Sequence, residues 1–166
     1  MVKSRITSPL GDIILVADEH SLVYSNWDEP ECERKLQNIL KTCSDKESPE
    51  DYIVLKGAEQ QLSEYFEGRR KEFDISLNFK GTSFQKNVWR NLRNLKYGQT
   101  LSYKELAYNC GNINGFRAVA HACGLNPLAI IVPCHRVITS NGSLGGYTGG
   151  LDKKRGLLTI EGSLSH

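Results

Sequence analysis

The sequence changes character near residue 80, and this change most constrains how the chain can fold. Residues 1–80 carry 11 Lys and Arg against 16 Asp and Glu, whereas residues 81–166 carry 10 against 3. The two halves therefore have net charges of −5 and +7, although the whole chain is only +2. Because 166 residues suffice for one domain or two small ones, we expect two domains, residues 1–80 and 81–166.

The first half has the pattern of a small α/β domain. Extended runs separated by polar turns predict a meander of three short strands at residues 3–8, 13–17 and 22–26. Apolar residues at helical spacing predict two helices and, after them, a candidate edge strand: residues 31–40, 55–66 and 72–75. We therefore expect a short antiparallel sheet with helices.

The second half predicts a mainly α-helical domain. Ser83 can cap a first helix over residues 83–95, and Ser102 with Glu105 has the spacing of a capping box for a second helix. After a tight turn, Asn114 can cap a further short helix, so the last two form a helix-turn-helix candidate. The remaining expected elements are an apolar strand at residues 129–132 and a closing helix over residues 151–160.

Charge and cysteine content limit the classes of function. A basic half that is poor in acidic residues suits a polyanion-binding surface, and chance clustering of solvated charge is the alternative. The five cysteines are scattered and include no Cys-x-x-Cys pair, which argues against a disulfide framework and a zinc knuckle. The sequence has no long apolar run, and its start is too polar for a secretory signal, so we expect a soluble intracellular protein with no membrane partner.

Cys134 has the neighbours that a nucleophilic thiol requires. It follows Pro133 at the end of the most apolar segment, and His135 and Arg136 come next. A proton acceptor and a positive charge both lower a thiol pKa, although most buried cysteines only pack. Adjacent residues of a regular strand face opposite sides, so a direct contact with His135 needs a bend or a bridging water, and Pro133 is compatible with a bend.

A histidine base is usually oriented by a carboxylate, and the second half offers Glu105, Asp152 and Glu161. Glu105 already belongs to the capping box, and ordinary solvation accounts for Glu161 at the end of the closing helix. The residues alone therefore leave the partner of His135 open. The other histidines are expected at the surface: His20, His121 and His166.

An ordered set of short motifs makes the functional reading more specific. Pro133-Cys134-His135-Arg136-Val137 is preceded by Asn126-Pro127 and followed by Gly145-Gly146-Tyr147-Thr148-Gly149-Gly150. This arrangement resembles the signature of the O6-alkylguanine-DNA alkyltransferases, the methylated-DNA–protein-cysteine methyltransferases. The likeness continues through the second half at Phe84-Gln85, Val88-Trp89, Tyr97-Gly98, Ser102-Tyr103, Leu106-Ala107, Arg117-Ala118-Val119 and Glu161-Gly162. The first half has the layout of the family's N-terminal domain, which implies an RNase H-like fold there.

The resemblance implies a suicide DNA repair protein, a methyltransferase that acts once on O6-alkylguanine in double-stranded DNA. Cys134 would accept the alkyl group irreversibly after the damaged nucleotide is flipped out of the duplex. His135 would take the thiol proton through a water molecule, and Glu161 would hold the imidazole. Asn126 would brace the bend near the cysteine, and Tyr103 would donate a proton to guanine N3.

The resemblance also implies a DNA-binding surface and a substrate pocket. Arg117 would fill the gap left by the flipped nucleotide, approached from the minor groove, and Tyr103 would rotate the 3′ phosphate. Other DNA contacts would come from Phe116, Ala118 and Asn112. Carbonyl groups of Cys134 and Val137 would read the exocyclic amine. The pocket would be lined by Pro133, Val137, Tyr147, Thr148, Gly149 and Ala129.

Three positions depart from the family pattern. Ala129 stands where members often have proline, Thr148 where they often have serine, and Gly146 replaces a commonly larger residue. A roomier pocket is expected, which leaves sensitivity to bulky benzyl-type pseudosubstrates open. We expect no cofactor, no metal and no obligate protein partner, so the protein is expected to be a monomer. The compartment would be cytoplasmic in a prokaryote and nuclear in a eukaryote.

Two other classes of function remain as alternatives. A non-catalytic damage sensor could keep the arginine and the binding helix, but relatives of that kind replace the reactive cysteine, which is present here as Cys134. A cysteine hydrolase would need an oxyanion hole and would turn over many times. The remaining motifs have no role in a hydrolase.

Overall fold

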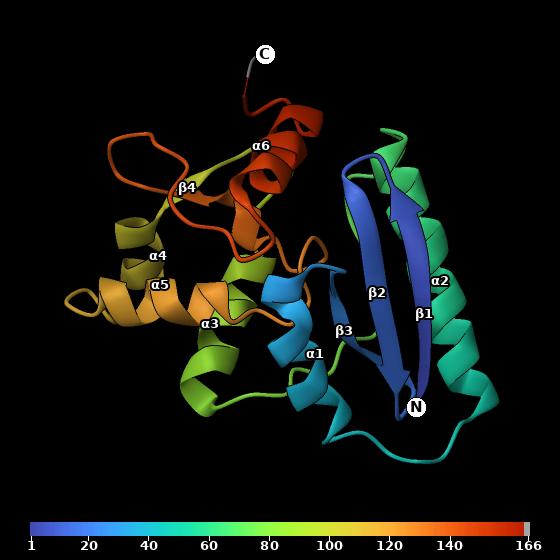
Figure 1. Cartoon of the computed structure of the whole chain (residues 1–166). Coiled ribbons are helices and arrows are strands. Elements are labelled where there is room, and N and C mark those ends of the chain that lie inside the picture. The colour runs from blue at the N-terminus through green and yellow to red at the C-terminus, as the bar shows by residue number, and fades with distance from the viewer. Residues whose placement is uncertain (165–166) are drawn as a thin grey trace. The chain divides into compact units, whose positions relative to one another are not determined.

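The computed structural model describes residues 1–164, and the polypeptide divides into two compact units between Lys80 and Gly81 (Figure 1). Each unit has its own small sheet and its own buried apolar side chains. Over the described part of the chain, no helix combines the length and the apolar character needed to cross a membrane.

The first unit is built on an antiparallel sheet of three strands in the order β1-β2-β3. The strands are β1 (Val2–Ser8), β2 (Gly11–Asp18) and β3 (Ser21–Trp27). Glu19 and His20 join β2 to β3 with positive φ angles of 49° and 68°, as a two-residue hairpin turn requires. The predicted meander is confirmed.

Strand β2 is the centre of this unit, because all of its residues from 13 to 18 are buried. Side chains alternate between the two faces of a strand, so such a strand needs cover on both faces. Ile14 and Val16 pack with Leu36 and Ile39, which belong to α1 (Glu33–Leu40). The long helix α2 (Pro49–Phe66) packs against all three strands, and Figure 1 shows α1 and α2 on opposite faces of the sheet.

Three details of this unit differ from the expectation. A short 3-10 helix, η1 (Pro30–Cys32), precedes α1. Helix α2 begins earlier than predicted because Ser48 caps it, accepting a hydrogen bond from the backbone of Asp51 at 3.2 Å, and Pro49 suits a first turn. The expected edge strand at residues 72–75 is wrong. Instead Leu22 bonds through both backbone groups to Ser76 and Asn78, at 2.8 and 3.0 Å.

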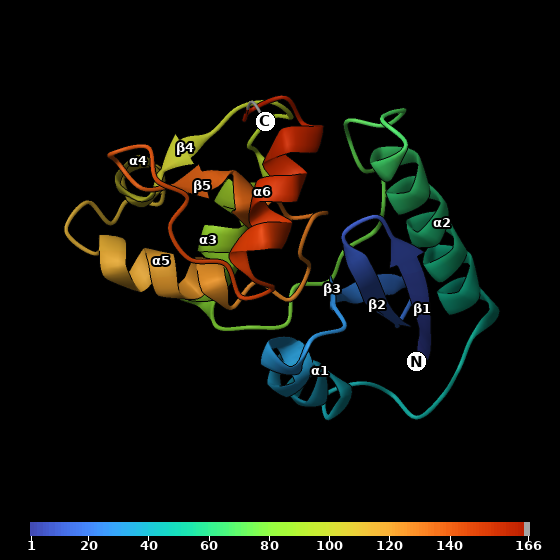
Figure 2. The ribbon, with the colours of Figure 1, turned by 45° about the horizontal axis from the view of Figure 1, so that its top comes forward.

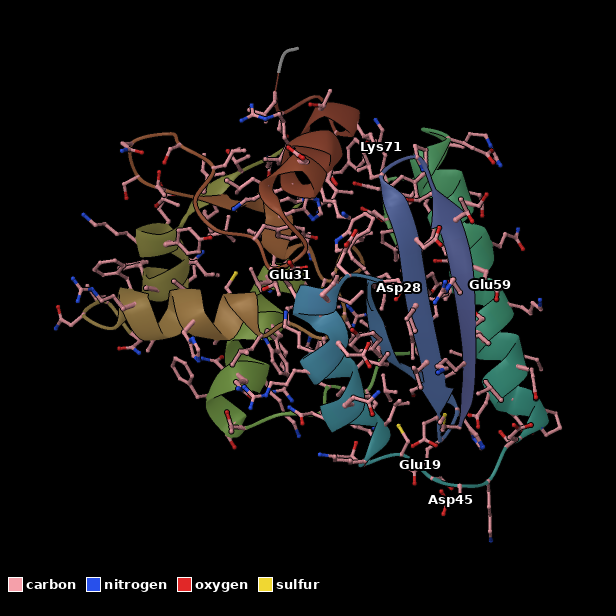
Figure 3. The ribbon with its side chains drawn as sticks, viewed as in Figure 1. Glu19, Asp28, Glu31, Asp45, Glu59 and Lys71 are labelled. Carbon is pink, nitrogen blue, oxygen red and sulfur yellow. The ribbon has the colours of Figure 1, made fainter. Side chains whose placement is uncertain are left out.

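The negative charge of the first unit is spread over many elements. Figure 3 labels acidic side chains that come from separate places along the chain: Glu19, Asp28, Glu31, Asp45 and Glu59. Some pair with cations of the same unit, as Asp28 does with Arg5 at 2.7 Å. The charge of −5 therefore does not mark a single acidic site.

The second unit is mainly helical. Its elements are α3 (Ser83–Arg93), β4 (Leu101–Ser102), α4 (Tyr103–Asn109), α5 (Phe116–Gly124), the 3-10 helix η2 (Cys134–Arg136), β5 (Val137–Ile138) and α6 (Leu151–Ile160). Strands β4 and β5 pair in parallel, and α6 lies beside β5 (Figure 2). Helix α3 packs against α4 and α5, where Trp89 donates from Nε1 to the Ala122 carbonyl at 2.9 Å.

The helix starts test the predicted caps. The Ser102–Glu105 capping box of α4 is confirmed, with both reciprocal bonds at 3.1 Å. Ser83 is not the cap of α3: Thr82 and Gln85 form that capping box, one residue earlier. The prediction of Asn114 as a cap is also wrong, because Gly115 occupies the cap position of α5 and makes no side-chain bond there.

The cap of α3 gives a first prediction. Thr82→Ala removes the hydroxyl that accepts from the Gln85 backbone, so the free energy of unfolding should fall by about 1 kcal/mol. Ser83→Ala is the matched control and should change it by less than about 0.5 kcal/mol, because Ser83 lies inside the helix and is exposed. Urea denaturation of both variants measures the difference. Equal losses would show that the cap is misassigned.

Candidate active site

The segment before Cys134 is a tight turn, and the strand predicted at residues 129–132 is wrong. The Val132 backbone donates to the Leu128 carbonyl at 2.8 Å, and Ile130 has a φ of +74°. Positive φ is strained for a β-branched residue, so the surroundings must hold this conformation. The buried side chain of Asn126 does so: it donates to the Val132 carbonyl at 2.8 Å and accepts from the Leu128 backbone at 2.9 Å.

This turn delivers Cys134 to the first position of η2, whose three residues are all buried. Cys134 is 9% exposed, and its neighbour His135 is 0% exposed. Because the backbone is coiled here, adjacent side chains no longer point to opposite sides as they would on a strand. The bend predicted around Pro133 is therefore present, as a 3-10 helix that the sequence did not predict.

His135, Arg136 and Glu161 form a buried cluster. Glu161 lies directly after α6, and its Oε2 is 2.7 Å from Nε2 of His135. Arg136 donates from Nε to Oε1 at 2.8 Å and from a terminal nitrogen to Oε2 at 3.1 Å. A further guanidinium bond reaches the Leu95 carbonyl at 2.6 Å. Of the three carboxylates that could orient His135, Glu161 is the one that contacts it.

Arg136 explains how a buried carboxylate keeps its charge. Burial by itself would raise the pKa of Glu161, but the hydrogen bond from His135 and the hydrogen bonds and charge of Arg136 outweigh it and hold that pKa at about 2. For His135 the balance is reversed, since burial lowers its pKa below the ordinary value despite the opposing pull of Glu161. At neutral pH the cluster therefore contains a carboxylate, a guanidinium and a neutral imidazole, and the guanidinium is the charge that stabilises the carboxylate.

These charge states fix the histidine tautomer. A carboxylate can only accept hydrogen bonds, so the Nε2 atom that contacts it carries the proton. The lone pair of the neutral ring is then on Nδ1, which is buried and has no hydrogen-bond partner among residues 1–164. Nδ1 of His135 is thus the atom that can accept a proton. The sequence also suggests that Arg136 lowers the pKa of the Cys134 thiol. In the structure its guanidinium group donates instead to the Glu161 carboxylate and the Leu95 carbonyl.

Tyr103 begins α4 and is half-buried, and burial raises the pKa of its phenol above the ordinary value. The phenol therefore keeps its proton at neutral pH. Gly145 lies against its ring with a φ of +72°, and a Cβ there would come within 3.1 Å of the Tyr103 ring. Only glycine allows the segment after β5 to pass so close to the tyrosine.

The predicted pocket residues lie on the two segments that flank this region. Pro133, Val137, Ala129 and Gly149 are buried, and Tyr147 and Thr148 are half-buried. Thr148 donates from its hydroxyl to the carbonyl of Gly124 at 2.9 Å, which ties its loop to the end of α5. Serine, which is common at this position in the family, has the same hydroxyl group. In this protein that hydroxyl is bonded to the Gly124 carbonyl.

The predicted DNA-contact residues lie at the exposed beginning of α5. Arg117 and Ala118 are exposed, Phe116 is 39% exposed, and Asn112 is half-buried in the preceding turn. Sequence reasoning missed two large apolar side chains near them, Tyr108 and Ile113, which are 67% and 66% exposed. Their hydrophobicity suggests burial, and nothing in the local pattern marks them as surface residues.

Two family descriptions match the chain in order. Residues 1–79 match the ribonuclease-like domain of 6-O-methylguanine DNA methyltransferase, and residues 83–163 match its DNA binding domain. The chain belongs to this methyltransferase family.

Individual relatives agree with that assignment over nearly the full chain. The methylated-DNA--protein-cysteine methyltransferase of Methanosarcina acetivorans is 44% identical over 160 residues, which is 94% of this chain and 95% of the relative. The protein of the same name from Mycobacterium tuberculosis H37Rv is 42% identical over 158 residues, 95% of this chain and 90% of the relative. The crystal structure of Mycobacterium tuberculosis OGT in complex with DNA matches with a TM-score of 0.81 and 39% identity, covering 97% of this chain and 92% of that one.

His20 and His121 are not part of the buried cluster. His20 and His121 are exposed, and His166 lies beyond the described residues. None of the five cysteines forms a disulfide. Within residues 1–164, no group of three or more His, Cys, Asp and Glu side chains is arranged to hold a metal ion.

The buried carboxylate gives a second prediction. Because the pKa of Glu161 falls from 4.5 to about 2, its charge contributes on the order of 3 kcal/mol to stability above about pH 4.5. This contribution is lost as the pH falls toward about 2, where the folded protein also takes up the proton. Glu161→Gln should therefore be less stable than the wild type by about 3 kcal/mol near pH 7, with a smaller gap near pH 3, in urea denaturation.

Asp152→Asn is the matched control, since Asp152 is an exposed carboxylate on α6, the helix that Glu161 follows. It should change stability by less than about 1 kcal/mol at either pH. A gap for Glu161→Gln that stays constant with pH would contradict the assigned charge.

Proposed function

We propose that this chain repairs alkylated DNA by transferring the alkyl group of O6-alkylguanine to Cys134. The observation that carries the proposal is the buried Cys134 beside a histidine whose tautomer is fixed by Glu161, within the fold of the methyltransferase family. A cysteine followed by an oriented histidine base is the arrangement that activates a thiol as a nucleophile.

The chemistry of the transfer matches a thiolate. The sulfur attacks the alkyl carbon, a carbon–sulfur bond forms, the bond from carbon to O6 breaks, and its electron pair passes to guanine. Thiolates are strong nucleophiles at neutral pH, which suits displacement at a saturated carbon. The product is a thioether with no leaving group that water can displace. Each molecule therefore acts once, as a stoichiometric methyltransferase that needs no cofactor.

Two proton transfers accompany this step. Nδ1 of His135 accepts the thiol proton through a water molecule, while Glu161 keeps the ring in place from Nε2. The departing guanine takes a proton at N3 from the phenol of Tyr103, which is protonated at neutral pH. A general acid at such a position contributes about 10²–10⁴-fold to a rate. Asn126 braces the turn that positions the cysteine.

In this proposal α4, the turn that follows it and α5 act as a helix-turn-helix that approaches the minor groove of DNA. A guanine inside a duplex cannot reach the buried sulfur, so the nucleotide is flipped out at a cost of a few kcal/mol. Arg117 enters the stack in its place, and Tyr103 rotates the 3′ phosphate. Neighbouring contacts come from Phe116, Ala118 and Asn112. The charge of +7 on the second half supports attraction to the phosphate backbone.

The flipped guanine is held by main chain and small residues. The carbonyls of Cys134 and Val137 accept from its exocyclic amine, and the loop with Tyr147, Thr148 and Gly149 forms a wall and offers an amide to O6. Pro133 and Ala129 complete the pocket. Because Ala129 is smaller than the proline that is common in the family, the pocket is larger than a methyl group requires. We propose that the protein does this as a monomer on double-stranded DNA.

The adduct itself gives a third prediction. Incubation with duplex DNA containing O6-methylguanine should add one methyl group per molecule, and fragmentation mass spectrometry should place it on Cys134. Cys134→Ala should gain no methyl group, whereas Cys110→Ala, which removes another thiol of the same unit, should react like the wild type. Repeated repair by one molecule would contradict a single-use thiol, as would a methyl group that persists in Cys134→Ala.

The role of Arg117 gives a fourth prediction. Arg117→Ala should slow transfer from duplex DNA by at least about tenfold, because the flipped state loses the side chain that fills the stack. The same variant should react normally with free O6-methylguanine base, which needs no flipping. Arg90→Ala removes an equal charge from an exposed position of α3 and serves as the control. Equal loss on both substrates for Arg117→Ala would point to a role in the pocket instead.

A further inference from the structure

Asparagine is followed directly by glycine at two places in the chain, Asn114–Gly115 and Asn141–Gly142. In such a pair the backbone nitrogen of the glycine can attack the side-chain amide of the asparagine, because glycine has no Cβ to hinder the approach. Both asparagines are exposed, the first in the turn before α5 and the second in the turn after β5. The two pairs can therefore be compared within one molecule.

The two glycine nitrogens are held in the same way. Gly115 donates its backbone N–H to the Asn112 carbonyl at 3.0 Å, and Gly142 donates to the Thr139 carbonyl at 3.0 Å. One backbone hydrogen bond therefore has to open before either nitrogen can react. A difference in reactivity between the pairs then depends on the asparagine side chains.

The side chain of Asn141 is held and that of Asn114 is not. Oδ1 of Asn141 accepts from the hydroxyl of Thr139 and from the backbone of Ser143, the latter at 3.1 Å. The side chain of Asn114 makes no hydrogen bond with any of residues 1–164. Its amide is thus free to turn toward the nitrogen of Gly115, whereas the amide of Asn141 first has to leave its two donors.

The packing of the turn before α5 requires glycine at position 115. A Cβ there would overlap the side-chain amide of Asn112, so a larger residue would force that half-buried side chain to move. Gly115 also occupies the cap position of α5. The glycine that makes Asn114 reactive is therefore a part of the fold.

We propose that Asn114 is a modification site, at which the folded protein deamidates through Gly115 and gains a carboxylate beside Arg117. The backbone nitrogen of Gly115 bonds to Cγ of Asn114, and its proton passes to the side-chain amide nitrogen, which leaves as ammonia. A cyclic imide remains, and water opens it at either carbonyl to give aspartate or isoaspartate. The net reaction consumes one water molecule and releases one ammonia.

The new carboxylate enters a segment that has none, because residues 106–151 contain no Asp or Glu. Arg117, two residues after the reacting glycine, is exposed and has no ion pair among residues 1–164. A negative charge at position 114 repels phosphate groups and competes with them for the guanidinium. Deamidation therefore weakens DNA binding at the start of α5. This effect on DNA rests on the proposed function, whereas the reaction itself does not.

The single use of each molecule gives this slow reaction time to occur. Under the proposed function, a molecule stays unreacted until it meets a lesion. Deamidation during that wait leaves Cys134 intact and changes only the surface that approaches DNA. An aged molecule would then keep its thiol and lose affinity for the duplex.

The reaction is tested on the unaltered protein, without DNA. The folded protein is incubated at neutral pH for days to weeks, and peptide mapping by mass spectrometry follows the conversion of each asparagine. Position 114 should react at least about fivefold faster than position 141, the factor for one extra net hydrogen bond that has to open at Asn141. In concentrated urea this difference should be largely lost, because neither side chain is held there. An equal or slower rate at position 114 of the folded protein would overturn the proposal.

The effect on DNA is tested with defined variants. Asn114→Asp supplies the charge, and Asn114→Gln keeps a neutral amide. The dissociation constant for undamaged duplex DNA should rise about threefold or more in Asn114→Asp and stay near the wild-type value in Asn114→Gln. The loss should shrink as salt is raised, because salt screens the repulsion.

Asn94→Asp is the matched control, since Asn94 is an exposed residue directly after α3 in the same unit. It should bind DNA like the wild type. Unchanged affinity in Asn114→Asp would overturn the effect on DNA, as would an equal loss in Asn94→Asp. Methyl transfer by freshly purified wild type is measured separately. Its absence would refute the proposed function, whereas the peptide map judges Asn114 alone.

Discussion

The ion pair between Arg136 and Glu161 is the contact on which the second unit depends. It joins the 3-10 helix that carries Cys134 to the residue that follows α6, and both partners are buried. Without the guanidinium, a buried carboxylate would take up a proton and could then donate to His135 rather than accept from it. The same ion pair therefore sets the charge of Glu161 and, through it, the tautomer of His135.

The turn before Cys134 shows why this charged cluster can form next to the thiol. A regular strand at residues 129–132 would send adjacent side chains to opposite faces. The chain instead turns at Ile130 with a strained positive φ, and the buried Asn126 amide holds the turn through two hydrogen bonds. Local strain of this kind costs on the order of 1–3 kcal/mol, and the surrounding apolar core offsets it. The strain is thus part of what places Cys134 and His135 on one short helix.

Features fixed by local rules could be predicted from the sequence, and features fixed by long-range packing could not. The three-strand meander and the Ser102–Glu105 capping box depend on neighbours in the chain, so their patterns sufficed. Thr82 and Ser83 both have a hydroxyl that suits a helix cap, and only the residue at which α3 begins shows which of them is the cap. The burial of Lys154 depends on carbonyls from two other segments. Lys154 lies three residues before the buried Leu157 and four before the buried Leu158. This helical spacing indicates that Lys154 is buried, but a charged side chain is normally expected at the surface.

The two ends of helix α5 are held differently. Its last turn is held by the Trp89 indole and the Thr148 hydroxyl, whereas its first turn begins at Gly115 with no side-chain cap. The end held by these side chains lies next to the loop proposed to line the pocket, and the uncapped end carries Arg117. Under the proposed function, the uncapped turn is the part of α5 that meets damaged DNA, while the two side-chain bonds keep the pocket end of the helix in place.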